Sequence, residues 1–123
     1  MPALAVGRTG AGAAVAFVDD GGDLRVSRLE GATWTTELVH DAAGITGDVS
    51  LAFDAGGGLH VAFVESGVLR GAARPSGARG WEGPIVVGDG ASAPVLRAGG
   101  ATIHLVWLRT DPSGSAVVAA RRR

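Results

Sequence analysis

The sequence predicts an all-β chain built from repeated units of four short antiparallel strands. Three observations lead to this expectation. The segment 50–64 recurs 44 residues further on at 94–108, and an earlier copy covers 4–18. Apolar segments of four to six residues, rich in Val, Leu and Ile, are bounded by Gly, Asp, Ser and Pro, as strands are. Finally, we find no stretch that combines a helical apolar period with helix caps.

The repeat carries anchors along its whole length. Trp34 and Trp81 lie 47 residues apart, and Leu24-Arg25 matches Leu69-Arg70. The chain is therefore interpreted as a single domain over 1–123, with units at 3–49, 50–93 and 94–123, the third without a last strand. The predicted strands cover residues 3–6, 13–18, 24–28, 34–39, 50–53, 59–64, 68–73, 81–87, 94–98, 102–108 and 115–121.

Glycine-rich and aspartate-rich segments separate these strands. Segments 19–23 and 111–114 join a second strand to a third, and 54–58 joins a first strand to a second. Such residues supply the positive φ angles and the side-chain-to-backbone hydrogen bonds of tight hairpins. The aspartates of 19–23 also suggest a calcium loop, but they lack the alternating ligands and final glutamate of an EF-hand. A hairpin turn is the preferred interpretation.

Four-stranded units that repeat every 40–50 residues are typical of β-propeller blades. A β-sandwich has similar strands, but the regular period favours the propeller. Propellers have about four to eight blades, so about 2.75 blades cannot close a ring. Each end blade would also expose an apolar face. Either the chain is part of a larger propeller, or copies close the ring; a homodimer with six blades is the favoured partner prediction.

The pattern of 50–81, SLAFDAGGGLHVAFVE, then GVLRGAAR and a Trp, resembles the blades of bacterial sialidase-like, BNR-type β-propellers, which include propeller lectins. Segment 27–34 resembles the Asp-box of that group, with Leu29 at the aspartate position. The resemblance implies a lectin-like, carbohydrate-binding module. It would also imply a tyrosine nucleophile for a sialidase, but the sequence contains no tyrosine. We therefore expect no enzyme activity, no catalytic residues and no cofactor.

Four residues are candidates for ligand binding. Trp34 and Trp81 begin the outermost strands, and Arg25 and Arg70 occupy matching positions in third strands. An exposed indole beside polar groups can stack on a sugar face, and it can equally pack between blades. A carbohydrate-binding module and a purely structural scaffold, natural or engineered, therefore both remain open.

Trp107 aligns with Phe17 and Phe63 in the repeat, which predicts that it packs in the core between blades.

His60 and His104 share one position in the repeat, which favours a structural role over metal binding or acid–base chemistry. The pair His40-Asp41 has no third ligand placed by its spacing, so no metal site is predicted.

The charge pattern bears on partners. The net charge is −1, and no basic stripe could neutralise a phosphate backbone, so we expect no nucleic-acid partner. The longest apolar runs, five or six residues, are too short to span a membrane. The basic run 121–123 is interpreted as a solvated tail that protects a strand edge.

Overall fold

The computed structural model describes residues 4–9, 12–41, 45–54, 56–99, 102–111 and 114–122. Within this part of the chain all regular structure is β-strand, which confirms the predicted all-β class. Each of the eleven predicted segments overlaps a strand of the described residues. The strands are β1 (Leu4–Thr9), β2 (Gly12–Val18), β3 (Leu24–Glu30), β4 (Thr33–His40), β5 (Ile45–Phe53), β6 (Leu59–Glu65), β7 (Val68–Arg74), β8 (Glu82–Gly88), β9 (Ala91–Gly99), β10 (Thr102–Asp111) and β11 (Gly114–Arg122).

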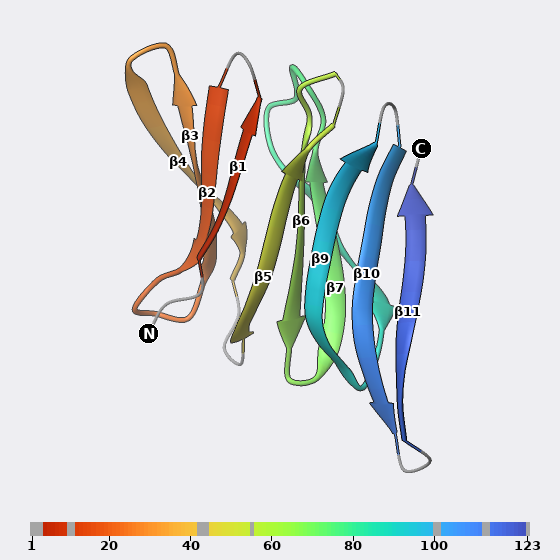
Figure 1. Ribbon diagram of the computed structural model, residues 1–123. Coiled ribbons are helices and arrows are strands. Elements are labelled where there is room, and N and C mark those ends of the chain that lie inside the picture. Colours follow the sequence, from red (N-terminus) through yellow and green to blue (C-terminus); the bar gives the residue numbers. More distant parts are fainter. Residues whose placement is uncertain are drawn as a thin grey trace.

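The strands form three separate antiparallel sheets in chain order. The first sheet has the order β1-β2-β3-β4, the second β5-β6-β7-β8, and the third β11-β10-β9. Within each sheet, consecutive strands are hydrogen-bonded neighbours, so every sheet is a meander, and none closes on itself among the described residues. Figure 1 shows the sheets side by side, from the N-terminal sheet to the C-terminal one.

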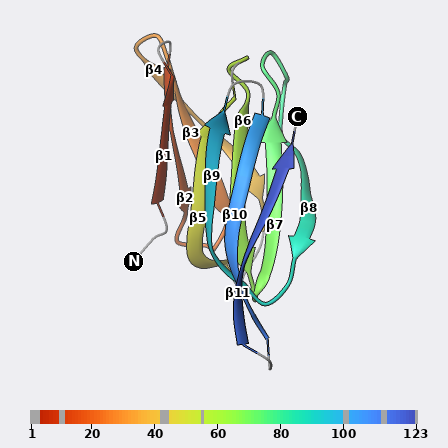
Figure 2. The ribbon, with the colours of Figure 1, turned by 45° about the vertical axis from the view of Figure 1, so that its right-hand side comes forward.

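The sheets stack through their faces. The closest approaches are between their first strands, β1 against β5 and β5 against β9, whereas the last strands β4 and β8 lie farther from the neighbouring sheet. Figure 2, turned from the first view, shows β5, β9 and β10 close together and β8 at one side. The second sheet is therefore covered on both of its faces.

Two apolar cores fill the spaces between the sheets. We call the contact of the first and second sheets the first interface, and that of the second and third sheets the second interface. The first interface buries Ala14, Ala16, Leu24, Val26, Val39, Leu51, Leu59, Val61, Phe63 and Ala72. The second interface buries Ala52, Ala62, Val64, Leu69, Leu96, Ile103, Leu105 and Trp107.

β6 shows why the sequence folds in this way. Its odd-numbered residues Leu59, Val61 and Phe63 lie in the first core, and Ala62 and Val64 lie in the second. Successive side chains of a strand point to opposite faces, so a strand buried on both faces needs a nearly continuous apolar run.

Two of the predicted turns are present as expected. Asp19 Oδ1 accepts hydrogen bonds from the amides of Gly21 (2.9 Å) and Asp23 (3.0 Å). Asp54 Oδ1 accepts them from Gly56 (3.0 Å) and Gly58 (2.8 Å) in the same way. The tip of the third predicted turn, 112–113, lies outside the described residues, and so do the side chains of the basic run 121–123.

Two first strands begin earlier than predicted. β5 starts at Ile45 rather than at 50, and β9 starts at Ala91 rather than at 94. Both pairings contain a register shift, between Ile45 and Val49 of β5 and opposite 106–108 for β9. Such irregularities admit polar residues and, on an edge strand, a proline, which are signals that usually end a strand.

Candidate functional site: the faces between and outside the sheets

Two of the four predicted ligand residues lie inside the first interface. The Trp81 indole packs against the first core, and its Nε1 donates a hydrogen bond to Glu37 Oε1 at 3.3 Å. Arg70 Nε lies 3.0 Å from Glu65 Oε1, as an ion pair without hydrogen-bond geometry. Trp81 therefore takes the packing role that the sequence left open.

The other two lie on the outer face of the first sheet. Leu24 and Val26 face the first core, so the alternating residues Arg25 and Leu29 of β3 face away from it, and Trp34 of β4 pairs with Leu29. This places Arg25 and Trp34 outside, and the Trp34 side chain is half exposed at 52%. Arg25 Nε donates to Asp19 Oδ2 at 2.6 Å.

The structure thus does not bring the four residues into one site. Arg25 and Trp34 repeat the arrangement of Arg70 and Trp81 one sheet earlier. The difference is that a neighbouring sheet covers the second pair, whereas the described residues leave the first pair uncovered.

Glu37 is an interface residue that the sequence did not single out. Arg28 Nε donates to its Oε1 at 3.1 Å, Arg74 Nε forms an ion pair with the same oxygen at 2.9 Å, and Trp81 is its third partner. Arg74 and Trp81 come from the second sheet, so this carboxylate connects two sheets. Its signal in the sequence was its position two residues before Val39, because residues two apart in a strand share a face and Val39 is buried.

Glu65 connects the same two sheets at another point. Its Oε1 lies 3.1 Å from His40 Nε2 of the first sheet and 3.0 Å from Arg70 Nε of its own sheet. The His40 ring also contacts the buried Phe63 ring, with centroids 5.3 Å apart. Polar groups that are half buried gain most when they are paired in this way.

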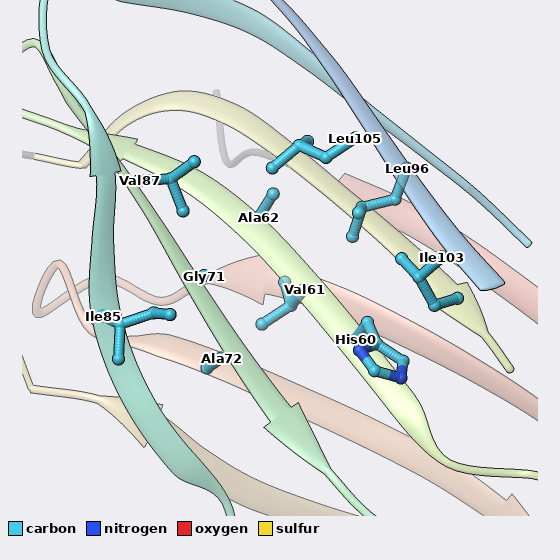
Figure 3. A pocket seen from close by; sticks show the side chains of 10 residues that line it. All are labelled: His60, Val61, Ala62, Gly71, Ala72, Ile85, Val87, Leu96, Ile103 and Leu105. Atoms are coloured by element: carbon cyan, nitrogen blue, oxygen red, sulfur yellow. The ribbon is translucent and has the colours of Figure 1, made fainter. Parts of the chain in front are cut away.

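The second interface contains an apolar pocket of about 140 Å³. Figure 3 shows the side chains that line it, with Ile85 and Val87 of β8 on one side and Leu96, Ile103 and Leu105 of the third sheet on the other. Gly71 of β7 contributes no side chain to the floor, which leaves the space open. Ile85 on the pocket wall is 60% exposed, so the pocket is open to solvent.

The outer face of the third sheet carries an apolar patch beside the exposed Arg97 and His104. Leu96 and Leu105 face the second core, and the alternating residues Val95, Val106 and Leu108 are 43%, 39% and 37% exposed. Exposed β-branched and leucine side chains in adjacent strands form a contiguous apolar surface, which commonly marks a contact with another molecule.

His60 and His104 lie in different surroundings. His60 Nε2 lies 2.9 Å from Asp54 Oδ2, at the end of the 54–58 turn, whereas His104 is exposed on the outer face of the third sheet. No three His, Asp or Glu side chains gather into a metal-binding group in the part of the chain that is described. Among the same residues, no helix is long and apolar enough to cross a membrane.

The two turn aspartates are held in their charged form. The pKa of Asp19 lies below its ordinary value of 3.8, first because Arg25 donates to the carboxylate and then because backbone amides do. For Asp54, burial acts to raise the pKa, but hydrogen bonds from His60 and the amides of Gly58 and Gly56 outweigh it and lower the pKa. Both carboxylates therefore stabilise their turns as anions.

No known protein-family model matches the chain, and a comparison with curated protein sequences finds no match either.

Proposed function

We propose that the three sheets are β-propeller blades of the sialidase-like type, and that the chain is a non-catalytic module which assembles with copies of itself. The contact would be head to tail, with the outer face of the first sheet of one copy against the outer face of the third sheet of another. Two copies joined at both faces would form a six-bladed ring.

One observation carries this proposal: the outer face of the first sheet repeats a face that is already packed inside the molecule. Phe17 corresponds to Phe63, and Trp34 corresponds to Trp81. Phe63 is fully buried against the first sheet, and Trp81 donates to Glu37 of that sheet. Phe17 and Trp34 have no such neighbour among the described residues, so a sheet of the same design is the partner that fits them.

The outer face of the third sheet supplies the complementary half. Its Val106 and Leu108 occupy the repeat positions of Ala62 and Val64. Ala62 and Val64 are buried between the second and third sheets. Within one chain, the face of a sheet that carries Ala62 and Val64, or their equivalents, packs twice against the face of the next sheet that carries Phe63 or its equivalent. One face of each kind, on the third and the first sheet, remains available for contact between chains.

The test uses one variant that blocks each face, with mass measured in solution by light scattering. Wild type should have the mass of two chains, and Phe17→Lys and Leu108→Lys should each reduce the assembly. A mixture of the two variants should recover a 1:1 complex, because each retains the face that the other has lost. A wild-type monomer at micromolar concentration, or a mixture that stays monomeric, would overturn the head-to-tail proposal.

Carbohydrate binding is the second candidate, and one observation favours it. Trp34 shares its exposed face with the Ser27 and Thr36 hydroxyls, which lie 2.7 Å apart, and with Arg25. An aromatic plane beside hydroxyl and guanidinium groups suits a pyranose ring. If this candidate is correct, Trp34→Ala abolishes binding on a glycan array and leaves the assembled mass unchanged. If the scaffold proposal is correct, the same change weakens assembly, and the array shows no binding by wild type.

A further inference from the structure

The geometry points to a binding site for an extended peptide at the second interface, formed by the pocket and the edge of β11. We infer that the occupant pairs with β11 as an added strand and places an aromatic side chain in the pocket. This site lies apart from the outer faces that the proposed assembly uses.

Equivalent positions of the first and second sheets carry different side chains. Val26 pairs with Glu37 in the first sheet, and Gly71 pairs with Ile85 at the same place in the second. Around Glu37 the first interface is filled by Trp81, which directly precedes β8, the outermost strand of the neighbouring sheet. Around Ile85 the second interface has the pocket instead.

The chemistry of the pocket wall fits an aromatic ring. Ile85 occupies the position equivalent to Glu37, which accepts the hydrogen bond of the Trp81 N–H in the first interface. The pocket wall therefore offers an apolar surface to a ligand and no carboxylate acceptor at this position. Its volume of about 140 Å³ is close to that of an apolar cavity of about 150 Å³ that takes up benzene in another protein. One six-membered ring therefore fits the space, and an indole fits because the pocket is open on one side.

The adjacent strand edge explains why the ring should come on a peptide. β11 is the terminal strand of its sheet and pairs with β10 alone among the described strands. Its other edge presents backbone amides and carbonyls to an incoming strand, which is the basis of peptide recognition by strand addition. In the second sheet, the corresponding edge of β7 is paired with β8, which follows directly after Trp81.

The chain itself supplies the probe. A synthetic peptide with the sequence of residues 79–90, RGWEGPIVVGDG, carries a tryptophan two residues after its start and then the apolar segment of β8. Binding of the labelled peptide to the full chain is measured by fluorescence anisotropy, and its position by NMR. We expect binding with shifts at Leu96, Ile103 and Leu105, and we expect the tryptophan-to-alanine peptide to bind about tenfold or more weakly.

The matched variant is Gly71→Val, which copies Val26 and fills the pocket floor. A Cβ at Gly71 would meet its nearest atoms at 3.7 and 3.8 Å, which is ordinary contact, so the variant should fold, as circular dichroism can verify. The variant should bind the peptide about tenfold more weakly than wild type does. Phe17→Lys, which alters only an outer face, should bind the peptide as wild type does, so a failed assembly and a failed pocket remain distinguishable.

Three results would overturn the inference: no binding by the wild-type peptide, equal affinity of the tryptophan-to-alanine peptide, or shifts confined to β7 that indicate exchange with β8. Free indole provides a further control. If indole alone binds as tightly as the peptide, the pocket is a small-molecule site, and the added strand is wrong.

Discussion

The two interfaces of this molecule use the same backbone arrangement with different side chains. The first interface combines its apolar core with Glu37 and Glu65, each of which contacts groups from both sheets. The second interface is built around apolar side chains and leaves a pocket of about 140 Å³ between Gly71 and Ile85 of the second sheet and Leu96, Ile103 and Leu105 of the third sheet. The repeat therefore determines how the sheets stack, and the side chains at individual positions determine whether an interface is filled or contains a pocket.

One pair of positions shows how the volumes are matched. Phe63 contacts the His40 ring in the first interface, whereas Trp107 lies against Gly88 in the second. The larger aromatic faces the residue without a side chain, and the smaller aromatic faces an imidazole. Interiors are packed closely enough that such volume exchange is required. Trp107 nevertheless leaves its buried Nε1 without a hydrogen-bond partner among the described residues.

The largest expected effect comes from removing either central aromatic. Phe63→Ala and Trp107→Ala should each lower the free energy of unfolding by about 3–5 kcal/mol, because a large buried side chain leaves a cavity. Urea unfolding followed by circular dichroism measures the loss. Trp107→Phe should cost clearly less, because the indole N–H has no partner to lose. If Val106→Ala on the outer face costs as much as Trp107→Ala, the assignment of the second core is wrong.

A second test makes the first interface resemble the second. Glu37→Ile places the residue of position 85 at the equivalent site and should destabilise the chain by about 1–3 kcal/mol, since Arg74 and Trp81 lose their partner. The matched control is Glu30→Gln, whose side chain is mostly exposed and contacts Arg28 at the surface. Equal stability of the two variants would show that Glu37 does not connect the sheets energetically.

A third test concerns the aspartate turns beside the two interfaces. The pKa of Asp54 is lower in the folded chain than in the unfolded chain. Its contribution is therefore complete above the unfolded value, near 4, and is lost as the pH falls through the lower folded value. Asp54→Asn should cost about 1 kcal/mol at pH 7 and should flatten the decline of stability between pH 5 and pH 2. An unchanged acid profile in thermal unfolding would contradict this role.

The smallest expected effect comes from filling the pocket. Gly71→Val gives the second interface the residue that the first has at Val26, and it should raise the free energy of unfolding by up to about 1 kcal/mol. Denaturant unfolding measures the gain, with Gly71→Ala as an intermediate step. A loss of more than about 1 kcal/mol would mean that the floor of the pocket cannot take a side chain.

The strand pattern was accessible from the sequence because each strand carries its own local signals. The 54–58 turn, with its aspartate and three glycines, predicts a hairpin wherever it occurs, and Asp54 makes the expected hydrogen bonds. The early starts of β5 and β9 were missed, because the pairing there depends on an irregular register with the neighbouring strand. Local composition contains no signal for that.

The candidate site shows the same division. The sequence selected Trp34 and Trp81 as equivalent residues, but it could not distinguish stacking on a sugar from packing on a sheet. That choice depends on what lies opposite each indole: Trp81 contacts Glu37 of the neighbouring sheet, whereas Trp34 is 52% exposed. Glu37 was missed because a carboxylate that will meet two guanidinium groups from distant positions looks, in sequence, like a surface residue.

By itself the sequence determined the all-β class, the number and approximate positions of the strands and the period of the repeat, since strand alternation and turn chemistry act over a few residues. Only the tertiary structure decided which strand faces are covered and which partners meet across them. Burial and ion pairing depend on residues that are far apart in the chain, as Glu37 and Trp81 are, and come together only when the sheets stack.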